Sequence, residues 1–418
     1  MKNQDISSSI DWITILLYTI LVVFGWMTIY SVTVPADQEY TFDFSMNYGR
    51  QMIFMIIAIP IIFAILFVDS KIFERFSFVF YGIGIALLLG LFVFGVTKKG
   101  QTNWYQFGGF GFQPSEFVKT AVALLMSKYL SDAQVNLAKK NFQYIAFAIM
   151  GLPIILILMQ PDAGSAMIFL SLVFVLYREG LPSWYLWTGA IAIATFLLAL
   201  IIKPIFLISF IAVFMVVHYI FNRLISRNPI VYGLIFVAIS SFAFSVSYMY
   251  DKVLEPHQKD RINVLLGKDV NMKKEGYNLH QSMIAIGSGG LLGKGYLEGT
   301  QTKGGFVPEQ HTDYIFTTVG EEWGFVGNLL VMSLFVCLFI RILYLAERQK
   351  TRFSRVYGYC VATYLFTHFF VNIAMLIRLF PTIGVPLPFF SYGGSSLWAF
   401  TIMLFIFIKL DANKVNEW

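Results

Sequence analysis

The hydrophobic positions of this chain gather in long runs that are separated by short polar stretches. A helix needs about 20 apolar residues to cross the hydrocarbon core of a bilayer. The runs therefore predict about twelve membrane-spanning helices, over residues 11–32, 51–68, 77–96, 115–131, 143–160, 164–178, 185–202, 204–222, 230–250, 312–342, 356–379 and 397–410.

Two of these runs need a closer look. Lys203-Pro204 interrupts the apolar stretch 185–250, and proline removes a helical hydrogen bond, so we expect two tightly joined helices there. A re-entrant pair is the alternative. The first run, residues 10–32, is too long for the apolar part of a signal peptide and lacks a small-residue cleavage site. It should remain in the protein as a span.

The composition supports a protein that lives in a membrane. Of the 418 residues, 57% are hydrophobic and 13% are charged, against about 25% charged in a typical soluble domain. Mean hydropathy is +0.70, which excludes ordinary soluble enzymes, disordered chains and coiled coils. We expect a single all-α domain over residues 1–418: a polytopic integral membrane bundle.

The charges predict how the bundle is oriented. The net charge of +6 is typical of cytoplasmic loops that collect Lys and Arg, so it does not indicate a nucleic-acid partner. The basic residues place both termini in the cytoplasm and the long hydrophilic segment 251–311 outside, as a structured loop. Cys337 and Cys360 lie in apolar stretches and indicate neither a disulfide framework nor a metal site.

Two polar groups stand at the outer ends of predicted spans, where charges are costly and by default functional. In the first, Pro114 should begin a helix that places Glu116 and Lys119 on one face. They form either a self-neutralising ion pair or a cavity wall in which Lys119 contacts an anion. In the second, residues 160–165, Asp162 either caps the next helix or holds a cation or a basic partner.

Two further groups follow the long loop. Capping by Thr312 or Asp313 would explain part of residues 308–314, but it does not require Glu309, His311 and Asp313 together. No nucleophile elbow, Walker A or HExxH motif accompanies them. Residues 381–396 contain too much Pro and Gly for one smooth helix. Such backbone survives at membrane depth only when it is buried in protein or lines a wet cavity.

These groups together resemble the SEDS family of membrane proteins (shape, elongation, division and sporulation). Residues 287–295 with 299–301 are similar to its rod-shape branch rather than to its division branch. Family members usually have ten spans, with seven before the long loop; here nine precede it, which predicts a two-helix insertion over 204–250. The loop also lacks a usual Pro near Asp269. The resemblance rests on Trp104 and on residues 113–119, 160–165, 276–282, 287–295, 308–313 and 381–396.

The resemblance implies a peptidoglycan glycosyltransferase that polymerises lipid II at the outer face of the bacterial cytoplasmic membrane, with inversion at the donor sugar. It implies Asp313 as the general base, Lys119 as a partner of the leaving pyrophosphate and Glu116 as the group that holds Lys119. A divalent cation is compatible with this chemistry. The remaining residues expected to contact substrate or shape its cavity are Trp104, Gln113, Asp162, Arg261, Glu309, His311, Ser391, Gly393 and Gly394.

Two other classes of function stay open at this point. A lipid II flippase or transporter would use the same buried charges as a path, and a non-catalytic scaffold of the elongation complex would use none of them. Against a transporter, the polar motifs face one side of the membrane. The resemblance also implies a class B penicillin-binding protein as a partner, together with other membrane proteins of the elongation complex.

Overall fold

The computed structural model describes residues 10–34, 43–98, 100–221, 228–254 and 275–414, together with 259, 263 and 266. The chain forms two compact units, residues 1–181 with 277–418 and residues 182–276. Among the described residues, ten helices are long and apolar enough to cross a membrane. The predicted polytopic helical fold is therefore confirmed, whereas the count of twelve and the orientation of the termini stay predictions.

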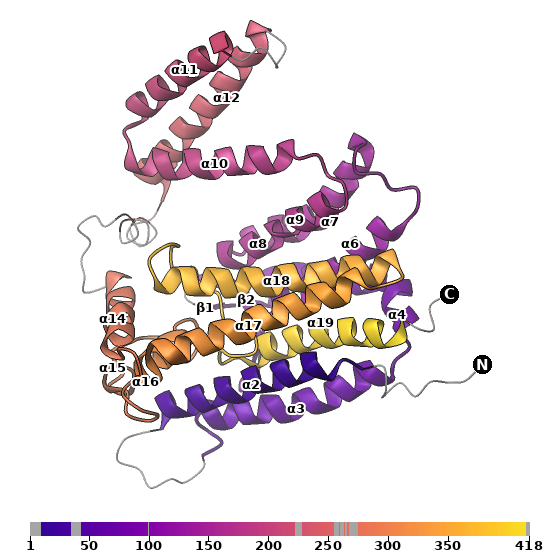
Figure 1. Cartoon of the computed structure of the whole chain (residues 1–418), viewed down its shortest axis with the longest axis vertical. Helices are drawn as coiled ribbons and strands as arrows, with labels where there is room; N and C mark the ends of the chain where they lie inside the picture. The colour runs from indigo at the N-terminus through magenta and orange to yellow at the C-terminus, as the bar shows by residue number, and fades with distance from the viewer. Residues whose placement is uncertain are drawn as a thin grey trace. The chain divides into compact units, whose positions relative to one another are not determined.

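The larger unit is a helical bundle (Figure 1). α18 and α19 are enclosed by the other helices, and α6 packs against both of them and against α5. The two predicted spans outside the ten correspond to α6, which carries three charged residues, and to the α8–α9 pair. The helices are α2 (Trp12–Thr33), α3 (Asn47–Phe67), α4 (Ser70–Arg75), α5 (Ser77–Phe94), α6 (Pro114–Ser131), α7 (Lys140–Leu158), α8 (Ala163–Leu170), α9 (Leu172–Arg178), α14 (Glu275–Ser288), α15 (Thr300–Lys303), α16 (Ile315–Glu322), α17 (Gly324–Glu347), α18 (Arg352–Leu376) and α19 (Gly394–Asn413).

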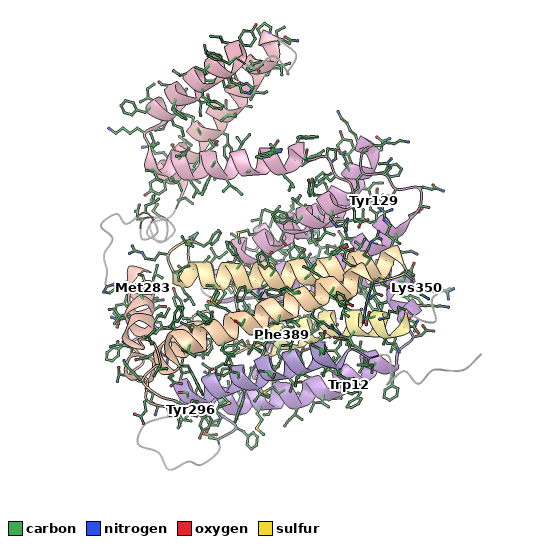
Figure 2. All side chains as sticks on the ribbon, in the orientation of Figure 1. Trp12, Tyr129, Met283, Tyr296, Lys350 and Phe389 are labelled. Carbon is green, nitrogen blue, oxygen red and sulfur yellow. The ribbon has the colours of Figure 1, made fainter. Side chains whose placement is uncertain are left out.

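Apolar side chains lie both inside and on the surface of this unit (Figure 2). Phe389 is buried, whereas Trp12 is 64% exposed at the start of α2. An exposed apolar surface of this extent suits contact with lipid rather than with water.

The smaller unit consists of α10 (Trp184–Ile201), α11 (Pro204–Phe221), α12 (Pro229–Tyr248) and the short π-helix η1 (Met249–Val253). α10 ends at Ile201 and α11 begins at Pro204, so the expected break at Lys203-Pro204 yields two tightly joined helices. Buried residues from the three helices form a small core: Ala199, Leu200, Leu207, Ala243 and Val246. α11 and α12 lie within residues 204–250; their status as an insertion relative to the family stays a prediction.

A small antiparallel sheet, which the all-α expectation did not include, lies between the predicted spans 77–96 and 115–131. It contains β1 (Val96–Lys98), β2 (Gln101–Phe107) and β3 (Phe110–Phe112) in the order β1-β2-β3. Gly100 and Gly108 supply the turns with φ of 81° and 56°. Thr, Trp, Tyr and Phe between these glycines favour an extended strand.

The predicted span 312–342 was wrong as a single helix, because the chain breaks at Trp323 between α16 and α17. Gly324 adopts a φ of 64° there. The backbone groups freed by the break pair with the glycine-rich loop: N–H groups of residues 294 and 295 donate to carbonyls 321 and 322, and N–H groups of 325 and 326 donate to carbonyls 290 and 291. These bonds satisfy groups that a helix end otherwise leaves open.

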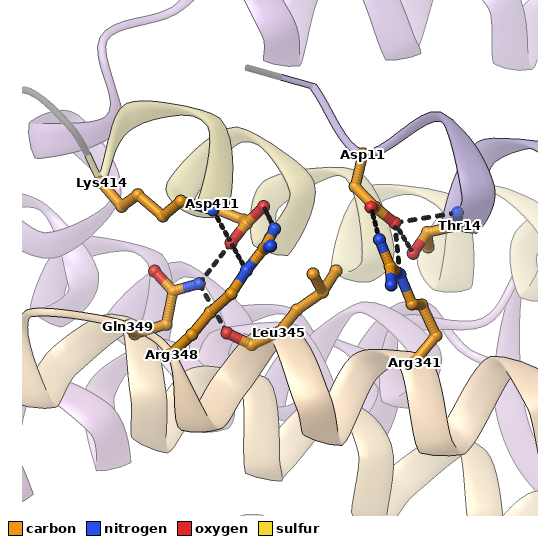
Figure 3. Close-up of polar contacts among 8 residues, drawn as sticks. All are labelled: Asp11, Thr14, Arg341, Leu345, Arg348, Gln349, Asp411 and Lys414. Carbon is orange, nitrogen blue, oxygen red and sulfur yellow. Dashed lines mark hydrogen bonds and ion pairs between the residues drawn. The ribbon is translucent and has the colours of Figure 1, made fainter.

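Ion pairs join α2, α17 and α19 near the C-terminal end of α17, opposite the break at Trp323 (Figure 3). Asp11 caps α2 by accepting a hydrogen bond from the Thr14 N–H (3.0 Å) and also binds Arg341. Asp411 on α19 accepts from Arg348 (2.8 Å) and from the Gln349 amide (2.7 Å). Charged residues therefore hold this end of the bundle together, and the polar motifs lie at the other end.

Candidate functional site

Glu116 and Lys119 form an ion pair in the first turns of α6. Pro114 is the first residue of this helix, as predicted, and the Lys119 Nζ lies 2.8 Å from the Glu116 Oε2. The same ammonium lies 2.7 Å from the His368 Nε2 and 5.0 Å from the centre of the Phe400 ring. The Lys119 side chain is 0% exposed. The ammonium that we expected to face an anion is therefore enclosed by protein groups.

α18 carries a polar pair, His368 and Asn372, one helical turn apart. The His368 Nδ1 faces the Pro386 carbonyl oxygen at 3.3 Å. The Asn372 amide nitrogen donates to the carbonyl oxygens of Val385 (2.8 Å) and Asp313 (2.9 Å). These two side chains thus attach the loop after α18, residues 377–393, to the helix and to the chain that carries Asp313.

Asp162 caps α8, as one of the two sequence readings expected, and also gathers neighbouring polar groups. It accepts from the Ser165 N–H (2.9 Å) and hydroxyl (2.8 Å). The Asn103 amide donates to Asp162 at 2.7 Å and the Gln113 amide at 3.4 Å. With both carboxylate oxygens accepting hydrogen bonds, Asp162 fits an organising role better than a role as a cation ligand.

Two residues of the loop 377–393 bring Asp162 and Asp313 into one region. A Cβ atom at Gly164, next to the Asp162 cap, would lie 2.7 Å from the Ile383 carbonyl oxygen, so only glycine allows this approach. A Cβ atom at Gly384 would lie 3.3 Å from the Asp313 Oδ2. The two carboxylate-bearing segments therefore flank consecutive loop residues.

The end of the same loop binds the segment before α16. The Ser391 hydroxyl donates to the Thr312 carbonyl oxygen at 2.7 Å, and the Tyr392 N–H donates to the His311 carbonyl oxygen at 2.9 Å. Burial raises the pKa of the Tyr392 phenol, and the nearby Arg50 charge opposes this rise. The phenol therefore stays protonated at neutral pH beside an exposed guanidinium.

Gly393 and Gly394 connect this loop to α3 and α19. The Gly393 N–H donates to the Gln51 Oε1 at 3.1 Å. A Cβ atom at Gly394 would lie 3.0 Å from the Phe54 ring. A cavity of about 390 Å³ opens beside them, with walls that are mostly aromatic: Phe54, Phe110, Gly111, Phe112, Gly394, Ser395 and Trp398.

Glu309, His311 and Asp313 are all partly exposed in the segment before α16. Glu309 adopts a φ of 55° and its carboxylate accepts from the Thr312 hydroxyl at 3.1 Å. The capping explanation for this segment was wrong, because Tyr314 is the N-cap of α16 and no side chain caps that helix. The Thr312 hydroxyl instead donates to Glu309, and the Asp313 carbonyl oxygen accepts from Asn372.

The roles of Trp104 and Arg261 stay predictions. Trp104 is half-buried on β2, opposite Val96 in the sheet and next to Asn103. Arg261 lies outside the described residues, as does Asp269.

His368, Asn372 and Asn103 were not predicted from the sequence, because the expected site consisted of charged residues and of Pro- and Gly-rich motifs at the ends of the apolar runs. His368 and Asn372 are uncharged polar residues four apart in an otherwise apolar stretch, which is a signal of a buried polar face. Asn103 carried no comparable signal, since it lies on a strand between two predicted spans.

Within the part of the chain that the structure describes, no group of three or more His, Cys, Asp or Glu side chains is arranged to hold a metal ion.

The fold and the site define a multi-pass membrane protein with a polar site at one end of its helical bundle. A family model for FtsW, RodA and SpoVE cell cycle proteins matches residues 11–226 and 205–416. The chain belongs to this family, as the resemblance predicted.

Individual relatives indicate the activity. Peptidoglycan glycosyltransferase RodA of Treponema pallidum (strain Nichols) is 30% identical over 436 residues, which cover 98% of this chain and 99% of the relative. Peptidoglycan glycosyltransferase MrdB of Escherichia coli (strain K12) is 34% identical over 331 residues, or 79% and 76% of the two chains. The chain is thus a peptidoglycan glycosyltransferase, which confirms the expected class of enzyme.

Two solved structures share the fold. A chain from a structure on polymerization and crosslinking by a peptidoglycan synthase complex has a TM-score of 0.72 at 24% identity and covers 98% of this chain and 99% of its own. Rod shape determining protein RodA of Thermus thermophilus has a TM-score of 0.63 at 21% identity, with 98% of each chain covered.

Proposed function

We propose that the chain polymerises lipid II at the outer face of the bacterial cytoplasmic membrane, for cell-wall elongation and rod shape, with Asp313 as the general base. The observation that carries this proposal is the approach of two carboxylate-bearing segments to neighbouring loop residues, Ile383 and Gly384. Asp162 is buried and fully hydrogen-bonded, whereas Asp313 is partly exposed. Of the two carboxylates, Asp313 is the one that a substrate can reach.

The proposed step transfers one glycan to another. The 4-hydroxyl oxygen of an acceptor GlcNAc attacks C1 of a donor MurNAc while the Asp313 carboxylate takes the hydroxyl proton. The new C1–O bond forms as the C1–O bond to phosphate breaks, and undecaprenyl pyrophosphate leaves with the electron pair. Attack opposite the leaving group inverts the configuration at C1.

The leaving pyrophosphate requires positive charge. Arg50 is exposed at the outer end of α3, and its charge lowers the pKa of the Tyr392 phenol. The Tyr392 N–H in turn donates to the His311 carbonyl oxygen. We assign Arg50 to the pyrophosphate for this reason. Lys119 would have to leave Glu116 and His368 to make the same contact. We therefore assign Lys119 a supporting role, in which it holds the loop 377–393 through His368.

The test is polymerisation of labelled lipid II by the purified full-length chain in detergent. Asp313→Asn keeps the shape of the side chain but removes the base, so we expect at least a ~100-fold loss of rate, within the range for a general base. Asp132→Asn, at an exposed carboxylate after α6, is the matched control. An Asp313→Asn protein that melts like the wild type and still elongates lipid II would remove Asp313 from this role.

The same assay tests Arg50. Arg50→Ala should lower kcat/KM for lipid II, whereas Arg75→Ala, at an exposed arginine of α4, should leave it unchanged. Equal kcat/KM values for the two variants would contradict the assignment. Translocation of lipid II across vesicles without polymer formation would instead indicate a flippase, and neither reaction would indicate a scaffold.

We also propose a class B penicillin-binding protein as the partner, within a larger elongation complex of membrane proteins. A polymerase that extends glycan strands needs a transpeptidase to crosslink them. Copurification of the two proteins, and a lipid II polymerisation rate that rises when the partner is added, would support this proposal. Rates that are identical with and without a partner that fails to copurify would contradict it.

A further inference from the structure

The Lys119 ammonium determines the protonation state of His368. A lysine ammonium has three N–H donors and no acceptor. Because it lies 2.7 Å from the His368 Nε2, that nitrogen must accept the hydrogen bond. The imidazole is then neutral and carries its proton on Nδ1, which lies 3.3 Å from the Pro386 carbonyl oxygen and donates to it.

The acceptor of this bond belongs to the part of the loop that reaches Asp313. The preceding carbonyl, at Val385, accepts from Asn372 at 2.8 Å, and the residue before it is Gly384, which faces the Asp313 Oδ2. α18 therefore holds two consecutive loop carbonyls, one through each side chain of its polar pair. Loss of the His368 bond would free the loop on one side of this attachment.

We propose that His368 is a positioning residue for the glycosyl transfer and that it works only as a neutral imidazole. Its imidazole binds Lys119 on one side and the Pro386 carbonyl oxygen on the other. His368 therefore fixes the loop near Asp313 relative to the Glu116–Lys119 pair on α6. His368 touches no substrate in this role. It acts by keeping the wall of the site in place.

Only a neutral His368 can make this attachment. An imidazolium has protons on both nitrogens, so the His368 Nε2 could not accept from Lys119, and two cations would lie 2.7 Å apart in a fully buried site. From α6, Lys119 faces the imidazole with Glu116 behind it. Among the described groups, Asp162 acts on Lys119 through its charge, α19 contributes the Phe400 ring, and the loop contributes only a carbonyl.

The experiment compares His368→Gln with His368→Leu in the lipid II assay, with the full-length chain. Glutamine can accept from Lys119 and donate to Pro386, but it does not titrate; leucine can do neither. We expect His368→Gln to keep the rate within about threefold, and His368→Leu to lose about tenfold to a hundredfold in kcat with little change in KM, as for a displaced catalytic group. His280→Gln and His280→Leu, at an exposed histidine on α14, are the matched controls.

The pH profile from about pH 5 to 8 tests the neutral state of His368. Because an imidazolium would lie 2.7 Å from the Lys119 ammonium in a buried site, His368 should stay neutral over this range, and His368→Gln, which does not titrate, should follow the wild-type profile. A loss on the acid side that the wild type shows and His368→Gln does not would overturn the neutral imidazole. If His368→Leu melts early, the profile of His368→Gln still decides this point.

Two results would overturn the positioning role of His368. One is a folded His368→Leu protein with a rate within about twofold of the wild type. The other is a His368→Gln protein that is as impaired as the leucine variant. The inference rests on the proposed polymerisation reaction. Asp313→Asn, assayed alongside, separates the two: activity that survives in Asp313→Asn contradicts the base and leaves the comparison of His368 variants readable.

Discussion

Asn372 binds the backbone of Asp313 and the backbone of Val385 with a single side-chain amide. Both N–H groups of that amide are used, at 2.9 and 2.8 Å, and the side chain is 0% exposed. The proposed base and the loop that faces it are therefore held at a common point on α18. A geometry that depends on one buried amide should be sensitive to its removal.

We expect Asn372→Leu to lower kcat for lipid II polymerisation by at least about tenfold. Leucine has the same branched shape but leaves the Asp313 and Val385 carbonyl groups without this donor, and a buried group left unsatisfied costs about 1–3 kcal/mol. Asn372→Asp should behave similarly, because a carboxylate offers no donors. Initial rates at saturating lipid II, together with melting temperatures in the same detergent, measure both effects.

Thr367→Val provides the control for this prediction. Its hydroxyl donates to the Thr363 carbonyl oxygen of its own helix at 2.7 Å, so its loss stays local. We expect it to keep nearly wild-type activity. An Asn372→Leu protein as active as Thr367→Val would show that the Asp313 backbone does not need this attachment.

The sequence predicted the parts of this site that depend on local pattern. Pro114 at a helix start, Asp162 at a cap and Glu116 three residues before Lys119 each follow from spacing along one segment, and the structure has all three. The long apolar runs predicted the helices for the same reason.

Contacts between distant segments could not be predicted in this way. His368 lies 249 residues from Lys119, and Asn372 lies 59 residues from Asp313. Only the packing of α6 against α18 and the course of the loop bring them together. The break at Trp323 was also missed, although Glu321, Glu322 and Gly324 interrupt the apolar pattern there, because the hydrogen bonds that make the break possible come from the loop at 290–295.

Gly164→Ala should impair polymerisation although the change adds a single methyl group. Its Cβ would lie 2.7 Å from the Ile383 carbonyl oxygen, so either α8 or the loop has to move. The displaced loop residue adjoins Gly384, which faces the Asp313 carboxylate. We expect a loss of about tenfold or more in kcat, since small displacements of reacting groups are costly.

Gly151→Ala, within α7, separates this steric effect from a general effect of alanine on a helix. A Cβ atom at Gly151 meets no atom within 4 Å, and alanine favours the helix by about 1 kcal/mol over glycine. This variant should keep full activity and melt no earlier than the wild type. Equal activity of Gly164→Ala and Gly151→Ala would contradict the close approach to Ile383.

The buried ion pair at the other end of the bundle should affect stability rather than catalysis. Arg348→Ala leaves the fully buried Asp411 carboxylate with Gln349 and Lys414 as its remaining partners. Loss of a buried partner costs about 3–5 kcal/mol; because the Arg348 side chain is 35% exposed, we expect about 1–3 kcal/mol. The exposed pair Arg178–Glu347 should matter less, since such pairs contribute about 0–1 kcal/mol.

Thermal unfolding of Arg348→Ala and Arg178→Ala in one detergent therefore measures the contribution of burial. Arg348→Ala should melt at the lower temperature, and Arg348→Ala/Asp411→Ala should recover part of the loss, because the double change removes the carboxylate that was left short of partners. Equal melting temperatures for the two arginine variants would show that the Asp411 cluster does not hold α17 to α19. The rate per folded molecule should stay at the wild-type value in each variant, since the cluster and the polar site lie at opposite ends of α17 and α19.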